Sequence, residues 1–283
     1  MRIKKTNILT KIQQDEILDL QANAYKYEDL ENEVFLSNEL NFDRSLPCFY
    51  MVYEEEKLVS FLGIFAPTSL EGEVVSFTHP QYRQKGYFKR LLKCAKESLN
   101  KAGINKIVFQ VESKSKSGLK VINKMKCNVI DHSEYRMSYN IREILNDEFD
   151  LKFVKVNNKN KDIFISITND GFGELEEGDE FINSLIESEE RCAYICYRDE
   201  EAVGCVNLKF DKDEVFLYGL AVVLRYRNQG IGRKIVRFVL NECSKKYSKV
   251  ILDVDSENPT AFNLYKKCGF TIDFEIDYYN YEF

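Results

Sequence analysis

The stretch YRNQGIGRKIV, from Tyr226 to Val236, is the part of the sequence from which the fold can be worked out. Two glycines, Gly230 and Gly232, stand immediately before a run whose apolar residues recur at helical spacing. The first amides of a helix have no partner within it, its dipole adds positive potential, and glycine lets an anion approach closely. The stretch therefore predicts an anion site at a helix N-terminus, among the basic residues Arg225, Arg227, Arg233 and Lys234.

Two common phosphate-binding motifs are missing around this turn. The first strand is not followed by Gly-x-Gly-x-x-Gly with an acidic residue at the dinucleotide-binding spacing, and no Gly-Lys-Ser/Thr marks a P-loop. Gly-x-Gly before a helix is also common in simple turns. The remaining interpretation is a pyrophosphate held by backbone amides after an inner strand, with further contacts later in the chain.

A second segment, NPTAFNLYKKCGF from Asn258 to Phe270, supplies a candidate for those later contacts. Asn258 suits a helix N-cap, Pro259 its first turn and Gly269 its end. Capping alone explains these three residues. It does not explain why they follow Arg-x-x-Gly-x-Gly, or why Tyr265 stands four residues before the terminal glycine.

The chain also repeats itself. A shift of 144 aligns the halves without a gap from about Tyr50 to Arg90, placing Gly86 on Gly230, and a shift of 143 continues the alignment. So long a period indicates a duplicated domain rather than a solenoid.

Each copy shows the same order of predicted elements: one or two helices, a hairpin, a third strand, the glycine turn, a helix, a buried strand, a short helix and a last strand. The second early helix is expected over Leu30–Leu40 in the first copy and Asp179–Ser188 in the second. This alternation predicts an α/β fold with helices packed on a mixed sheet. The predicted domains are residues 1–145 and 150–283, linked near Asn146–Asn160, a polar stretch rich in Asn and Lys.

Leu220–Phe270 resembles the GNAT superfamily of acyl-CoA N-acyltransferases. LAV-x-x-RYRNQGIG is similar to its pyrophosphate motif, Gln/Arg-x-x-Gly-x-Gly/Ala, and N-x-x-A-x-x-LYKKCGF to its second CoA-contacting segment. The resemblance covers essentially the whole chain, twice. It implies two GNAT-like domains, each a mixed, mostly antiparallel sheet flanked by helices, with acetyl-CoA as cosubstrate.

The resemblance also implies roles for residues of the second copy. Leu220, Ala221 and Val222 would align their backbone with the pantetheine arm, and Asn258 would contact the arm from the other side. Tyr265 matches a tyrosine that protonates the departing thiolate, although it also suits a core position on a short helix. The loop residues implied in holding the pyrophosphate are Arg227, Asn228, Gln229, Gly230, Ile231, Gly232 and Arg233.

Direct attack by an amine on the thioester needs little beyond a stabilised oxyanion and a base that accepts the ammonium proton. Glu214 lies on the strand before the turn, and Asp253 lies where ribosomal-protein N-terminal acetyltransferases carry a glutamate. Both are candidate bases, and both also suit solvated positions at a strand end.

The first copy keeps Arg83 and Gly86 but departs from the pattern at four other places: Phe88 replaces Gly232, Ser115 replaces Asn258, Gly118 replaces Ala261 and Ile122 replaces Tyr265. Isoleucine cannot donate a proton. The sequence therefore predicts that the second copy holds acetyl-CoA and that the first has become a structural or substrate-shaping domain.

Composition narrows the remaining possibilities for the 283 residues. A net charge of −6 argues against nucleic-acid binding, and only His79 and His132 are available for a histidine-rich metal site or a Ser-His-Asp triad. Eight cysteines without metal spacing indicate reduced core residues in a cytoplasmic protein, and no signal peptide or membrane span is expected.

The leading prediction is an enzyme that acetylates a primary amine of a small molecule or peptide, acting as a monomer or homodimer. The alternatives are a regulatory protein that binds CoA or a metabolite without turnover, and an enzyme that loads acyl-CoA in both copies.

Overall fold

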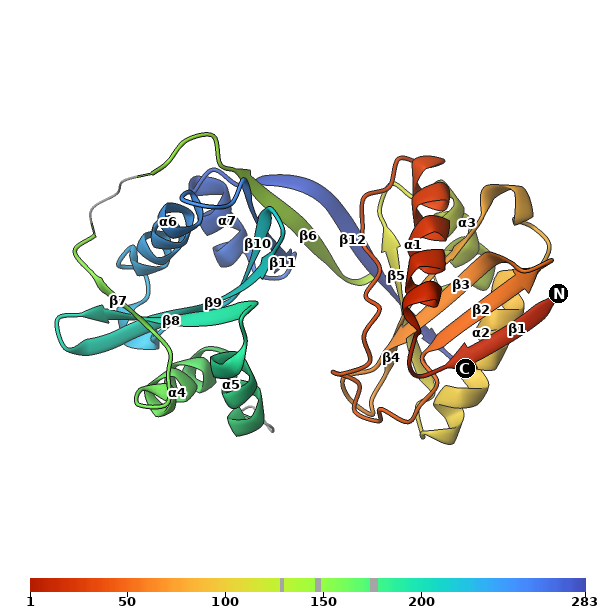
Figure 1. The fold of residues 1–283 in the computed structure, drawn as a ribbon, viewed down its shortest axis with the longest axis horizontal. Helices are drawn as coiled ribbons and strands as arrows, with labels where there is room; N and C mark the ends of the chain where they lie inside the picture. The colour runs from red at the N-terminus through yellow and green to blue at the C-terminus, as the bar shows by residue number, and fades with distance from the viewer. Residues whose placement is uncertain (128–129, 146–148, 174–177) are drawn as a thin grey trace. The chain divides into compact units, whose positions relative to one another are not determined.

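The computed structural model describes residues 1–127, 130–145, 149–173 and 178–283. Residues 146–148, part of the predicted link, lie outside them. The chain forms two compact units, residues 1–134 with 274–283 and residues 135–273 (Figure 1). The division into domains of residues 1–145 and 150–283 stays a prediction.

The first unit contains most of the elements of the first copy. In chain order they are β1 (Arg2–Thr6), α1 (Lys11–Lys26), β2 (Phe49–Glu54), β3 (Lys57–Phe65), β4 (Gly72–Thr78), the short helix η1 (Pro80–Tyr82), α2 (Tyr87–Lys101), β5 (Lys106–Glu112) and α3 (Lys116–Met125).

The second unit repeats this order. Its elements are β7 (Lys152–Lys155), α4 (Lys161–Phe172), α5 (Gly178–Glu187), β8 (Arg191–Arg198), β9 (Glu201–Asp211), β10 (Glu214–Val222), η2 (Leu224–Tyr226), α6 (Ile231–Cys243), β11 (Lys249–Asp255) and α7 (Pro259–Lys267). The strands β1 and β7 that open the two copies are not anticipated by the sequence patterns.

The terminal strands of the two copies change places. The end of β12 (Thr271–Glu282) pairs antiparallel with β5 and completes the sheet of the first unit. Residues 135–140 of β6 (Ile130–Asn140) belong to the second unit, where β6 neighbours β11. The last strand of each copy is therefore part of the sheet of the other copy.

Both sheets are mixed and mostly antiparallel, as predicted. The parallel pairs are β4–β5 and β10–β11, and the pairs along β1–β4 and β7–β10 are antiparallel. In the first unit α1 and α2 lie on opposite faces of the strands (Figure 1). The second unit places α4 on one face and α6 on the other.

The glycine-loop helices face the sheets through apolar residues at helical spacing. Five of these residues are completely buried: Leu91, Ala95 and Leu99 of α2, and Ile235 and Val239 of α6. This packing fixes the N-terminus of each helix against the end of the strand that precedes it.

The helix expected over residues 30–40 is wrong, because this segment is held in an extended path. The amides of Glu31 and Asn32 donate to Glu112 Oε2 at 2.9 and 3.0 Å, and the Val34 amide donates to Gln21 Oε1. These tertiary hydrogen bonds replace those of a helix. The expected counterpart in the second copy does form a helix, α5.

Candidate cofactor and catalytic site

The glycine turn of the second unit leaves a row of amides without protein partners. Asn228 and Gly230 have φ angles of 61° and 78°, and Gly230 caps α6 without a side-chain hydrogen bond. Among the described residues, no acceptor binds the amides of residues 228–233. A Cβ on Gly230 would meet no atom within 4 Å, so the space before these amides is open. The turn can therefore receive an anion.

Side chains brace this turn from behind. Arg227 Nε donates to the Val222 carbonyl at 3.0 Å, and Gln229 Nε2 donates to the Arg225 carbonyl at 3.1 Å. Arg198 Nη1 in turn donates to Gln229 Oε1 at 2.8 Å and holds that side chain in place. The side chains of Arg227 and Gln229 thus hold the loop shape, while the backbone amides remain available.

The strand that leads into the turn separates from its parallel neighbour. The β10–β11 pairing covers only Glu214–Phe216 with Lys249–Ile251, although β10 continues to Val222. Between Tyr218 and Ala221 its pairing with β9 shifts by one residue, which marks a bulge. Gly219 lies in this bulge with φ 57°. The bulge reorients the backbone where Leu220, Ala221 and Val222 are expected to meet the pantetheine arm.

This bulge corrects the gapless alignment of the two copies. In the first unit β3 and β4 pair without a shift from Ser60–Thr78 to Phe65–Glu73. By pairing, the counterpart of Leu217 is therefore Val74, one residue away from the position that a constant shift of 144 would assign. The chain between the paired residues Phe65 and Glu73 is one residue longer than the chain between their counterparts Lys209 and Phe216, so the sequence shows no gap.

Asn207 of β9 faces the bulge. Its side chain is 4% exposed, and its Oδ1 atom has no hydrogen-bond partner in the described part of the chain. A Cβ on Gly219 would lie 2.3 Å from Asn207 Nδ2. Sequence reasoning missed both residues, although a glycine inside a strand pattern is a known signal for a bulge.

Tyr265 lies on α7 within the core of the second unit. It is 7% exposed, and its ring is 5.8 Å from that of Phe270. Burial raises the pKa of Tyr265 to about 12, so the phenol stays protonated at neutral pH. Within the described residues its hydroxyl makes no hydrogen bond, which leaves its proton available.

The side chain of Asn258 is engaged in capping, because its Oδ1 accepts from the Ala261 amide at 3.0 Å. Any contact with a ligand would therefore use its remaining polar atoms.

The two candidate bases lie in different places. Asp253 is on β11, two residues past the last residue that pairs with β10, and accepts from Arg136 Nε at 2.5 Å and Nη2 at 3.0 Å. Glu214 is the first residue of β10. Six residues of strand, roughly 20 Å, separate it from Leu220. The structure brings Asp253, but not Glu214, to the opening between the strands.

In the first unit the glycine turn keeps the same backbone shape. Gln84 and Gly86 have φ angles of 65° and 80°, close to those of their counterparts in the second unit. Phe88, however, packs on Phe109 with ring centroids 6.2 Å apart. Ser115 takes over the capping role of its asparagine counterpart by accepting from the Gly118 amide at 3.1 Å.

An internal carboxylate bridges this turn and the following short helix in the first unit. Glu28, with 6% of its side chain exposed, forms an ion pair with Arg83 and accepts from the Ser117 amide at 2.8 Å. Burial opposes its ionisation, but the hydrogen bonds from Ser117 and Arg83 hold the pKa of Glu28 below its ordinary value. A carboxylate of the protein thus binds Arg83, the counterpart of Arg227, and the N-terminus of α3, the counterpart of α7.

Fold and site together define an α/β protein with a glycine turn of unbonded amides beside a pair of parallel strands that separate. The chain belongs to the acetyltransferase (GNAT) family, which it matches over residues 14–125 and 154–270. The tandem arrangement expected from the repeat is therefore confirmed.

Two curated relatives are similar to part of the chain. N-alpha-acetyltransferase 50 of Danio rerio is 32% identical over 100 residues, 33% of this chain and 59% of the relative. N-alpha-acetyltransferase 30 of Saccharomyces cerevisiae is 34% identical over 74 residues, 24% of this chain and 42% of the relative. The chain thus matches about half of the length of these relatives.

Solved structures are similar over nearly the whole chain. A GCN5-related N-acetyltransferase from Sphaerobacter thermophilus has a TM-score of 0.81 at 13% identity, covering 99% of this chain and 95% of that one. A tandem GNAT protein from the clavulanic acid biosynthesis pathway has a TM-score of 0.75 at 13% identity, covering 99% and 98%. These likenesses support the fold.

Two further findings concern the described residues alone. No helix among them is long and apolar enough to span a membrane. No group of three or more His, Cys, Asp or Glu side chains within them could hold a metal ion.

Proposed function

We propose that the second unit transfers an acetyl group from acetyl-CoA to a primary amine by direct attack. The observation that carries this proposal is the combination, in one unit, of unbonded amides at residues 228–233 with the bulge at Gly219. The first unit has the same turn, but its β4 strand has no bulge, and Arg83 beside the turn already forms an ion pair with Glu28.

Each part of the site has a role in this reaction. The loop amides would hold the pyrophosphate, and the backbone of Leu220–Val222 would align the thioester. The amine nitrogen bonds to the acyl carbon, the carbon–sulfur bond breaks, and the departing sulfur takes a proton. Tyr265 is suited to supply that proton, because its buried phenol remains neutral.

Asp253 is the base that we favour over Glu214, because it lies where β10 and β11 separate. Its carboxylate is oriented by two hydrogen bonds from Arg136, and it would accept the ammonium proton directly or through water. Arg136 would then be a positioning residue. The acceptor is a small amine or, following the names of the two curated relatives, the α-amine of a peptide.

A calorimetric titration of acetyl-CoA tests the site. We expect one site per chain, lost in Gly230→Trp and kept in Gly86→Trp. The pair is matched, because both glycines have φ near 80° and open space around the Cβ position. Two sites, or loss of binding only in Gly86→Trp, would overturn the assignment to the second unit.

Turnover is tested separately by CoA release with a panel of small amines and peptides. Binding without CoA release from any acceptor would favour the regulatory alternative.

A further inference from the structure

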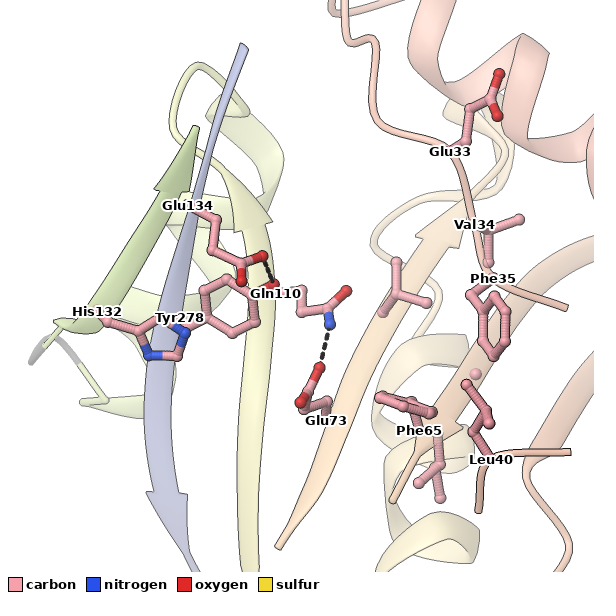
Figure 2. Close-up of a pocket in the computed structure, with 13 residues that line it drawn as sticks. Glu33, Val34, Phe35, Leu40, Phe65, Glu73, Gln110, His132, Glu134 and Tyr278 are labelled. Atoms are coloured by element: carbon pink, nitrogen blue, oxygen red, sulfur yellow. Dashed lines mark hydrogen bonds between the residues drawn. The ribbon is translucent and has the colours of Figure 1, made fainter. Parts of the chain in front are cut away.

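The first unit contains a cavity of about 360 Å³ that the proposed acetyl transfer does not use. It lies beside β3, β4, β5, β6 and β12 and is bounded on another side by residues of the extended segment 33–40 (Figure 2). All of its lining residues belong to the first unit.

One wall of the cavity is polar and acidic. Gln110 Nε2 donates to Glu73 Oε2 at 2.5 Å, and the Tyr278 hydroxyl donates to Glu134 Oε2 at 2.6 Å, as Figure 2 shows. With Glu33, three carboxylates line the space, and none of the described lining residues is lysine or arginine. The cavity is therefore a region of negative potential.

Burial places the Glu73 carboxylate where water solvates it poorly. Burial raises the pKa of Glu73, and the nearby charge of Glu134 raises it further, against the effect of the Gln110 hydrogen bond. A cation placed beside Glu73 would relieve both effects.

The opposite wall is apolar and aromatic. Phe35 and Phe65 meet edge to face with centroids 5.6 Å apart, and Leu40 lies beside them (Figure 2). On the polar side, His132 stacks on Tyr278 at 4.2 Å. Phe35 and Leu40 are 49% and 59% exposed, so their apolar surfaces are accessible to a ligand in the cavity.

We propose that this cavity binds an organic cation, a small molecule with a protonated amine and an aromatic or alkyl body. The ammonium group would lie between Glu73 and Glu134, where two carboxylates and aromatic rings attract positive charge. The apolar body would cover Phe35, Phe65 and Leu40. The site binds without a chemical step and is separate from the glycine turn of the second unit.

A single tryptophan provides a local probe, because the chain contains none. In Phe35→Trp, titration with phenethylamine should give a saturable change in emission. The neutral analogue 2-phenylethanol and the anion phenylacetate, which have the same ring, should not. Equal responses to the amine and the alcohol would overturn the charge-based proposal.

Glu73→Gln in this background should weaken phenethylamine binding by about tenfold or more, while Glu97→Gln on the exposed side of α2 should not change it. Measured by calorimetry in the chain without Phe35→Trp, amine binding should be unchanged by Gly230→Trp, so the result does not depend on the acetyl-CoA site. If Phe35→Trp fails to fold, calorimetry on the unaltered chain and on Glu73→Gln makes the same comparison. No saturable binding at millimolar amine, or unchanged binding in Glu73→Gln, would refute the proposal.

Discussion

The acyl transfer that we propose for the second unit depends on a few single residues. Gly230 needs its positive φ angle, and the side chains of Arg227 and Gln229 donate hydrogen bonds to backbone carbonyls next to the loop. Tyr265 is different, because its hydroxyl makes no hydrogen bond within the described structure. Burial raises the pKa of Tyr265 to about 12, so the phenol keeps its proton at neutral pH.

Replacing Tyr265 with phenylalanine should therefore separate catalysis from folding. We expect the rate of CoA release to fall by roughly 10²-fold, within the usual contribution of a general acid. The free energy of unfolding should change by less than about 0.5 kcal/mol, since no hydrogen bond is lost. Single-turnover CoA release and denaturant unfolding measure the two quantities. An unchanged rate would show that another group protonates the thiolate.

At the scale of elements, the bulge in β10 is the clearest difference between the two units. It was hidden in the sequence, because one extra residue in the bulge is balanced by one extra residue in the β3–β4 connection. Tertiary contacts also outweigh the local sequence pattern over residues 30–40, where hydrogen bonds to Glu112 and Gln21 replace a predicted helix. Local sequence patterns could not predict the bulge or the extended segment, because the residues that contact them are far away in the sequence.

Gly219→Ala tests the bulge. We expect it to destabilise the chain by about 1–3 kcal/mol, through the left-handed φ and the collision of the new Cβ with Asn207 Nδ2. In an Asn207→Ala background the collision is absent, so the cost of Gly219→Ala should be smaller. Denaturant unfolding of the four chains gives the coupling. Equal costs in both backgrounds would mean that Asn207 does not shape the bulge.

At the scale of the whole molecule, the two copies exchange their last strands, and the apolar cores contain most of the cysteines. All eight thiols are free, six of them buried, as expected of reduced core residues. Burial raises the pKa of Cys48, Cys196 and Cys243 to about 12. Partial burial likewise raises the pKa of Tyr194 to about 12.

These groups predict a loss of stability at alkaline pH. In the unfolded chain cysteine ionises near pH 8.5 and tyrosine near pH 10, so above about pH 9 the unfolded state binds fewer protons. The free energy of unfolding should therefore fall as pH rises toward 12. Denaturant unfolding across this range measures the slope, and Cys196→Ala should make it shallower. A flat profile would contradict the burial of these thiols.

The amino-acid sequence was enough to identify the family, the duplication and the copy with the better cofactor motif. These follow from local features, because the conformation of a glycine turn and the N-terminus of the next helix depend on adjacent residues. The exchange of last strands, the bulge opposite Asn207, the Glu28 bridge in the first unit and the acidic cavity were decided only by tertiary structure. Each depends on which distant strand or side chain satisfies a backbone group or a charge, and spacing along the chain does not specify that choice.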